Sequence, residues 1–282
     1  MFNVKYRQPL LAIHFAVLLF ALSGLFAKWL ILPAITIVFG RTFFACLFIG
    51  AIFLLQKKSL ILSRKLIMPL AITGVVLALH WLSFFAAIQV SSVTIGLITF
   101  AIFPVFVSFL EPVFFKESFQ FKSLLQALLT LAGIVLVLPL ENIDSDVSLG
   151  ALLGITSALT FAILTLLNRK FVVKTPAMTV ALYQNVFACV SLLPFFIIFP
   201  ASISLSELLI LILLGGIFTA LAHSMFNYSL TQLKAQTVSI VVSLEPIYGI
   251  VAAVILLDES LTLSMQLGCA IVIAANVWAL RN

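Results

Sequence analysis

The sequence predicts an all-α polytopic membrane protein, on the basis of its composition, its long apolar runs and the distribution of its basic residues. Of the 282 residues, 64% are hydrophobic and 9% are charged, and the mean hydropathy is +1.32. Soluble domains are about half apolar and about a quarter charged. The 27 Phe residues suit contact with lipid and with other helices, because a Phe ring needs no hydrogen-bond partner.

Ten apolar runs predict ten transmembrane helices. Each run has about 20 residues, enough to cross a hydrocarbon core of about 30 Å at about 1.5 Å per residue. The first is too long for a typical signal peptide, so we expect it to be retained. Because ten spans use most of the chain, we expect the function to lie inside the helix bundle. The runs lie at residues 9–29, 33–55, 66–88, 92–115, 121–140, 148–168, 177–199, 207–229, 235–257 and 262–280.

The basic residues predict the orientation in the membrane. With a cytoplasmic N-terminus, thirteen of the 15 Lys and Arg residues fall on the cytoplasmic side, whereas Lys28 falls outside and Arg41 lies within a span. This bias predicts that both termini are cytoplasmic. It also explains the net charge of +6 without nucleic acid, because the cations form no patch. Cys46, Cys189 and Cys269 lie within spans without metal-site spacing, so we expect no metal and no cofactor.

An internal repeat divides the chain into two halves. Sliding the sequence against itself gives an ungapped match at an offset of 142 residues. We therefore predict two five-helix repeats, residues 1–140 and 148–282, and five is odd, so the second repeat is inverted in the membrane. Inverted repeats are typical of transporters that hold their substrate near the midplane between the halves. The matched positions are Gly74 with Gly216, Pro104 with Pro246, and the Glu-Ser pair at 117–118 with that at 259–260.

The joint pattern resembles the drug/metabolite transporter superfamily, in particular its EamA family. The motifs that carry the resemblance are Arg41 in GRTFFA, Pro104 in IFPVF, and LEPIYGIVAAVILLDES at 244–260 followed by Gly268. The resemblance implies a secondary carrier of the bacterial inner membrane, commonly an exporter of amino acids or related metabolites, with a cavity lined by both halves. Substrates in the superfamily range widely, so the resemblance does not name the cargo. We expect a monomer or a homodimer whose partners are a small solute and the lipid bilayer.

The repeat separates scaffold from candidate site residues in the ninth span. Pro104 and Pro246 occur in both halves and read as scaffold that bends or breaks a helix. Glu245 has no such counterpart, because Phe103 stands opposite it. A carboxylate about ten residues into a span is costly and is by default a functional hypothesis. Glu245 either carries a transported proton or faces a substrate ammonium, or it bonds the backbone that Pro246 frees.

Arg41 is the second intramembrane charge, with Tyr183 at the equivalent position. It either clamps a neighbouring helix or anchors an anionic group of the substrate. Further polar residues lie at similar depth, and each by itself reads as well as an interhelical hydrogen bond. As a set they suit a small polar or zwitterionic solute. The predicted substrate-binding residues are Glu245, Arg41, His80, Trp81, Tyr183, Gln184, Asn185, His223 and Asn227.

The other acidic residues of the motifs are interpreted as structural. Glu111 also precedes a proline, but it lies near the cytoplasmic end of its span, where we expect it to extend to water. Glu117 and Glu259 lie on opposite sides of the membrane, beside Ser118 and Ser260, which we interpret as helix N-caps.

The sequence favours a transporter over two other functions. A polytopic membrane enzyme would need a catalytic constellation, and HExxH, GxSxG and paired intramembrane Asp residues are all missing from the sequence, so no catalytic residue is assigned. A channel would need a ring of like residues or filter loops. We therefore predict export of an amino acid or related solute by alternating access. A proton-coupled carrier and an uncoupled facilitator or exchanger, for example of nucleosides or amines, remain alternatives.

Overall fold

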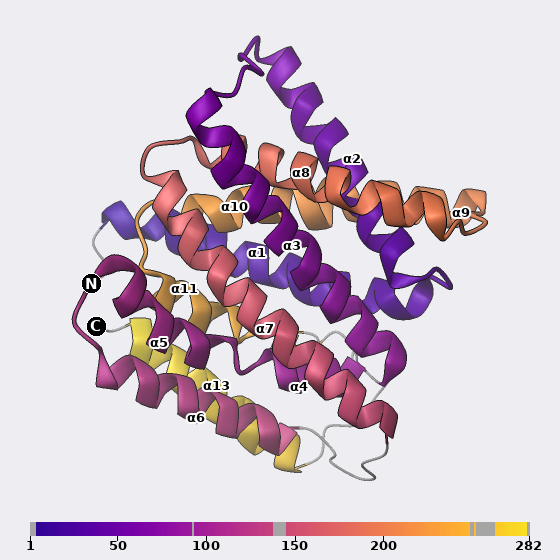
Figure 1. The fold of residues 1–282 in the computed structure, drawn as a ribbon. Coiled ribbons are helices and arrows are strands. Elements are labelled where there is room, and N and C mark those ends of the chain that lie inside the picture. The colour runs from indigo at the N-terminus through magenta and orange to yellow at the C-terminus, as the bar shows by residue number, and fades with distance from the viewer. Residues whose placement is uncertain (1–3, 92, 138–144, 249–250, 252–262, 281–282) are drawn as a thin grey trace.

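The computed structural model describes residues 4–91, 93–137, 145–248, 251 and 263–280, and all regular structure in these ranges is helical. Within these ranges, six helices are long and apolar enough to cross a membrane. Each of them falls on one of the predicted spans (Figure 1). They are α1 (Val4–Trp29), α2 (Ala34–Leu55), α3 (Arg64–Val90), α7 (Ser145–Val172), α8 (Ala177–Ile198) and the continuous rod of α9 (Leu205–Gly215), η1 (Gly216–Leu221) and α10 (Ala222–Ser229).

The remaining helices are shorter. The predicted span 92–115 is two helices, α4 (Val93–Phe100) and α5 (Phe103–Phe115), and α6 (Phe121–Val137) follows. In the ninth span α11 (Ala235–Val242) ends at a turn before Glu245, and the last helix is α13 (Leu263–Leu280). Because α6 begins at Phe121, Ser118 is not its N-cap, and that prediction is wrong. Glu259 and Ser260 lie outside the described residues.

Two helix breaks occupy equivalent places in the two halves. The turn at residues 101–102 separates α4 from α5, and the turn at residues 243–244 follows α11, at the repeat offset of 142. Pro104 lies in the first turn of α5, and Pro246 follows its turn in the same way. A proline costs no intrahelical bond there, because the first N–H groups of a helix have no partner within it. Each proline therefore lies at the start of a new helix just after a break. The helices that precede the two breaks, α4 and α11, both have eight residues.

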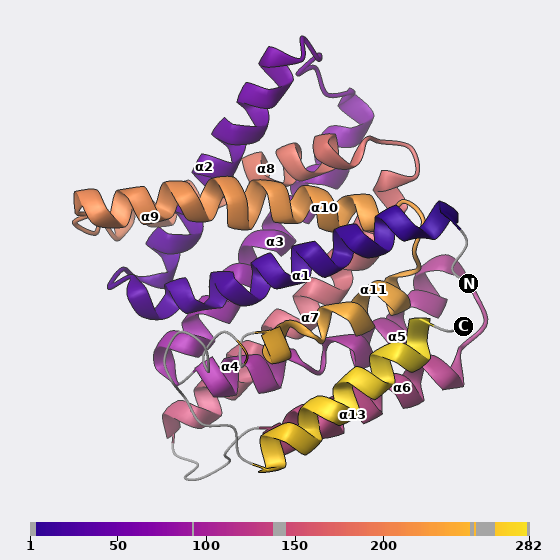
Figure 2. The ribbon, with the colours of Figure 1, turned by 180° about the vertical axis from the view of Figure 1, so that it is seen from behind.

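The two halves interleave reciprocally. Helix α2 packs on α9 and η1 while α8 packs on α3, and α1 packs on α10 while α7 packs on α3. Helices α6 and α13 lie side by side in both views (Figures 1 and 2). Glycine permits the close crossings: a Cβ on Gly74 would lie 2.9 Å from the Gln184 carbonyl oxygen, and one on Gly215 would lie 3.0 Å from that of Arg41. This exchange puts helices of both halves around one central space.

Candidate functional site

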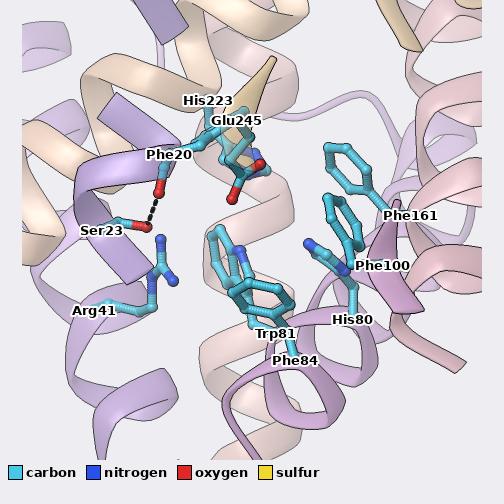
Figure 3. Close-up of a pocket in the computed structure, with 10 residues that line it drawn as sticks. All are labelled: Phe20, Ser23, Arg41, His80, Trp81, Phe84, Phe100, Phe161, His223 and Glu245. Atoms are coloured by element: carbon cyan, nitrogen blue, oxygen red, sulfur yellow. Dashed lines mark hydrogen bonds between the residues drawn. The ribbon is translucent and has the colours of Figure 1, made fainter. Parts of the chain in front are cut away.

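A central pocket lies where both halves meet, beside the two helix breaks. Its walls come from α1, α2, α3, α4, α7 and α10 and from the start of the helix after α11 (Figure 3). The space totals about 360 Å³ when its open side is included, yet it has room for only about one water molecule. The pocket therefore has little free space in this conformation. It is lined by Phe20, Ser23, Arg41, His80, Trp81, Phe84, Phe100, Phe161, His223 and Glu245.

Arg41 is 1% exposed and spans from α2 to two other elements. Its Nε donates to Thr219 Oγ1 at 3.0 Å and its Nη2 donates to the Phe218 carbonyl at 3.5 Å. Both acceptors lie in η1, a π-helical turn. The guanidinium carbon also lies 4.0 Å from the centroid of the Trp81 ring. Two of five N–H donors are used in these bonds, so Arg41 clamps its neighbours and still presents donors to the pocket.

Glu245 brings the opposite charge to the pocket and is 6% exposed. Within the described part of the chain its carboxylate has no hydrogen bond and no ion pair, either with Arg41 or with the backbone beside Pro246. Figure 3 shows the Glu245 carboxylate and the Arg41 guanidinium both directed toward the space beside Trp81. Two buried, opposite charges thus face one pocket without neutralising each other by contact.

His80 is tied to α7 by one edge of its ring. Its Nδ1 lies 3.1 Å from the Ser157 carbonyl oxygen and 2.8 Å from Ser157 Oγ. The ring stacks on Phe161, with centroids 4.5 Å apart. His80 therefore has a fixed orientation in the pocket wall.

His223 and Trp81 are in contact in the pocket wall. They are equivalent at the offset of 142, and their rings touch edge to face with centroids 4.8 Å apart. His223 is fully buried, and neither of its ring nitrogens has a hydrogen-bond partner among the described residues. A buried imidazole with both nitrogens unsatisfied is costly in a purely structural position. His223 therefore brings two unsatisfied buried polar atoms to the pocket wall.

Comparison with known proteins assigns the family. The profile of the EamA-like transporter family matches residues 8–138 and 148–281. The chain belongs to the EamA-like transporter family. It is 28% identical over 269 residues to the uncharacterized transporter YxxF of Bacillus subtilis (strain 168), which covers 92% of this chain and 85% of that protein. It is also 28% identical over 200 residues to an uncharacterized transporter of Archaeoglobus fulgidus, over 71% of this chain and 72% of the relative.

A solved crystal structure shares the fold of this EamA-family transporter. The superposition has a TM-score of 0.80 and covers 96% of this chain and 97% of the other, at 16% identity. The predicted membership of the drug/metabolite transporter superfamily is confirmed, and with it a multi-pass membrane protein of the two-repeat fold.

Five of the nine predicted site residues line the pocket of this transporter: Arg41, His80, Trp81, His223 and Glu245. The phenylalanines of the wall were missed, because one apolar side chain in an apolar sequence carries no signal of its own. Ser23 was missed because a serine within a helix often bonds the backbone of the preceding turn, as Ser23 does with the Phe20 carbonyl. The repeated Pro104, which lies just after the break that follows α4, is the sequence signal that could have led to Phe100, the last residue of that helix.

Two of the other predicted residues belong to a buried ring of amides. Gln184 donates to Asn168, Asn168 Nδ2 donates to Asn227 Oδ1 at 2.8 Å, and Asn227 Nδ2 donates to Gln184 Oε1 at 3.4 Å. The three side chains come from α7, α8 and α10 and are fully buried. Each amide donates once and accepts once, so the ring joins three helices of the second half and is not part of the pocket wall.

Tyr183 and Asn185 also lie away from the pocket. The Tyr183 hydroxyl donates to the carbonyl of Leu60, in the segment between α2 and α3. Asn185 is fully buried, and its Nδ2 donates to the carbonyl of Ala181 in its own helix. In the described ranges no three His, Cys, Asp or Glu side chains gather in a way that would hold a metal ion.

Glu111 corrects one interpretation of the sequence. It does not extend to water, because it is 1% exposed. Its carboxylate accepts the backbone N–H groups of Ala235 and Gln236, at 2.8 and 2.9 Å, where α11 begins. Arg169 Nη1 lies 2.5 Å from the same carboxylate and its Nη2 lies 2.9 Å from Glu117. Glu111 therefore joins α5 of the first half to α7 and α11 of the second.

Proposed function

We propose that this EamA-family protein is a secondary transporter that exports a small zwitterionic metabolite, an amino acid or a related solute, by alternating access. The central pocket is its substrate site. Arg41 binds the carboxylate of the solute, and Glu245 binds its ammonium group. The name transporter on both relatives supports the class of function; the solute and the direction are our proposal.

The observation that carries the proposal is the pair of unneutralised charges in one pocket. Glu245 is buried without a partner among the described residues, and Arg41 faces the same space with spare donors. Leaving a charge buried and unpaired is expensive, so a fold that needed only stability would place apolar residues there. A zwitterion satisfies both charges at once and adds no net charge.

The membrane arrangement that suits this function is ten spans in two inverted repeats, residues 1–140 and 148–282. Both termini then lie in the cytoplasm, and the protein lies in the inner membrane. The pocket lies between the halves and has little free space in this conformation. A solute enters when the halves rock apart on one side of the membrane and leaves when they part on the other.

The test is to compare transport and folding of the Glu245→Gln variant. Gln keeps the shape of the side chain and removes the charge that binds the ammonium group. We expect uptake of radiolabelled amino acids into inverted vesicles to fall at least about tenfold, a loss of about 1.4 kcal/mol of interaction. The yield of folded protein in detergent should stay near that of the wild type. Equal loss of flux and of folded yield would contradict the proposal.

Coupling to protons is tested separately. Glu245 is the described intramembrane carboxylate that lacks a partner, so it is the group that would carry a transported proton. An imposed pH difference across the vesicle should then change both rate and accumulation in the wild type, and neither in Glu245→Gln. If rate and accumulation do not respond in the wild type, the protein is a facilitator or an exchanger.

A further inference from the structure

The contacts of His80 determine which of its nitrogens carries the proton. The Ser157 carbonyl oxygen, 3.1 Å from Nδ1, can only accept a hydrogen bond. Ser157 Oγ donates its own proton to the His80 carbonyl at 3.1 Å, so this hydroxyl also accepts at Nδ1. Nδ1 is therefore the protonated nitrogen. In the neutral imidazole Nε2 is then left as a hydrogen-bond acceptor.

Nε2 of His80 faces the pocket without a partner among the described residues. The hydrogen bonds of the ring all involve Nδ1, and His80 is one of the residues that line the pocket. Figure 3 shows the ring directed into the space beside Trp81. The acceptor lies among aromatic side chains, since the ring centroids of Phe161 and Phe100 are 4.5 and 5.6 Å from that of His80. This end of the pocket thus combines flat apolar walls with one fixed acceptor.

We infer that His80, held in place by Ser157, is a specificity-determining residue that selects solutes whose flat apolar group carries an N–H or O–H donor. The inference rests on the proposed function, because Arg41 and Glu245 hold the charged end of the same zwitterion. Flat groups pack well against the walls of Phe84, Phe100 and Phe161. A group without a donor leaves Nε2 unsatisfied in a dry site, which lowers its affinity.

Matched pairs of amino acids test the inference on the wild-type protein. Tyrosine and phenylalanine differ by one O–H donor, and tryptophan and 1-methyltryptophan differ by one N–H donor. We expect the donor-bearing member of at least one pair to bind about 3- to 10-fold more tightly, the range of one net hydrogen bond. Affinity is measured by thermal shift of the purified protein and by competition against flux.

Two variants assign the preference to His80 and Ser157. His80→Phe keeps an aromatic ring and removes the acceptor, so tyrosine and phenylalanine should bind to this variant with equal affinity. Ser157→Ala removes one of the two groups that hold Nδ1. It should reduce, but not abolish, the ratio of the affinities for tyrosine and phenylalanine. The control is Ser191→Ala, whose hydroxyl bonds, among the described residues, to the Ala188 carbonyl of its own helix. It should leave the ratio unchanged.

The outcomes separate the inference from the proposed function. Equal affinity within both pairs in the wild type would overturn the inference and leave the proposed function standing. The inference would also be overturned if a folded His80→Phe protein still preferred the donor-bearing member of a pair. Failure of all four amino acids to bind, while other amino acids still bind, would overturn the inference alone. Failure of every amino acid to bind would overturn the proposed function, and the inference with it.

Discussion

Two glutamates of this protein stand in the same tripeptide, Leu-Glu-Pro, and both are buried, yet their surroundings are opposite. Glu111 is 1% exposed and accepts from Arg169 and from the backbone N–H groups of Ala235 and Gln236. Glu245 is 6% exposed and has no such partner within the described residues. Burial alone does not separate a structural carboxylate from a functional one. What separates them is whether the carboxylate already has hydrogen-bond and ion-pair partners within the protein.

The contrast has a physical reason. The charge of Glu111 is compensated by one guanidinium and by the start of α11, where the N–H groups favour an anion. Glu111 therefore contributes to the contact between the two halves. Glu245 interacts with the charge of Arg41 across the pocket but has no contact partner among the described residues, so a solute in the pocket can compensate its charge directly. Burying an unpaired carboxylate costs stability, and a protein keeps such a residue where binding of a ligand offsets that cost.

The largest expected effect is the loss of stability in Glu111→Gln. The amide has a single acceptor oxygen for the two backbone N–H groups and carries no charge, so the buried ion pair with Arg169 is lost and Arg169 keeps only its contact with Glu117. We expect a loss of about 3 kcal/mol, the size found when one partner of a buried ion pair is removed. Thermal unfolding in detergent measures it. The matched variant Glu245→Gln should change stability by less than about 1 kcal/mol. A similar loss in both would remove the contrast between the two glutamates.

Arg41→Gln should lose transport and some stability together, because Arg41 has two roles. Loss of the bond to Thr219 and of the contact with Trp81 should cost about 1 to 2 kcal/mol. Flux should fall at least about tenfold, as it does when a charged partner of the substrate is removed. Thr219→Val is the control: it removes the acceptor and keeps the charge, so it should lower stability and keep most of the flux. Normal flux in Arg41→Gln would exclude Arg41 as the carboxylate anchor.

The amide ring should affect stability alone. Asn227→Ala leaves Asn168 and Gln184 each short of one partner, and hydrogen bonds within membrane proteins average about 0.6 kcal/mol. We expect a loss of about 1 kcal/mol, with the affinity of the surviving protein for its solute unchanged. A clear drop in solute affinity at wild-type stability would instead place the ring in the binding site.

The smallest effect concerns the pH dependence of the ion pairs that Glu117 makes with Arg169 and Lys234, outside the predicted spans. Burial acts to raise the pKa of Glu117, but the hydrogen bond from Arg169 and the charges of Arg169 and Lys234 bring it below its ordinary value of 4.5. A lowered pKa in the folded state contributes stability above the unfolded value and loses it as pH falls through the folded value. Stability of the wild type should therefore fall more steeply below about pH 4.5 than that of Glu117→Gln. Parallel curves would show that Glu117 adds nothing.

Much of the fold could be predicted from the sequence, because lipid imposes long apolar runs and the repeat fixes their grouping. The six long helices fall on predicted spans, and both helix breaks lie beside the repeated prolines. The π-helical turn η1 was not predicted, since GIFTAL reads like any apolar helix. Its carbonyls matter because the buried Arg41 is held there.

The candidate site was predicted where a charge or ring sits at an unusual depth, as with Arg41 and Glu245. Depth does not give the face of a helix, so Gln184 and Asn227 were grouped with the pocket although they bond to Asn168. Glu111 shows a further limit. Its partner α11 begins 124 residues later in the chain, and nothing local to Glu111 indicates that contact.

The most direct test of the account removes one charge at a time from the solute and from the protein. Binding of an amino acid, of the amine without its carboxylate and of the acid without its amino group is measured on wild type, Arg41→Gln and Glu245→Gln. We predict that the wild type prefers the zwitterion at least about tenfold. Arg41→Gln should abolish the preference over the amine, and Glu245→Gln should abolish the preference over the acid. Equal loss of affinity for all three solutes in both variants would contradict the account.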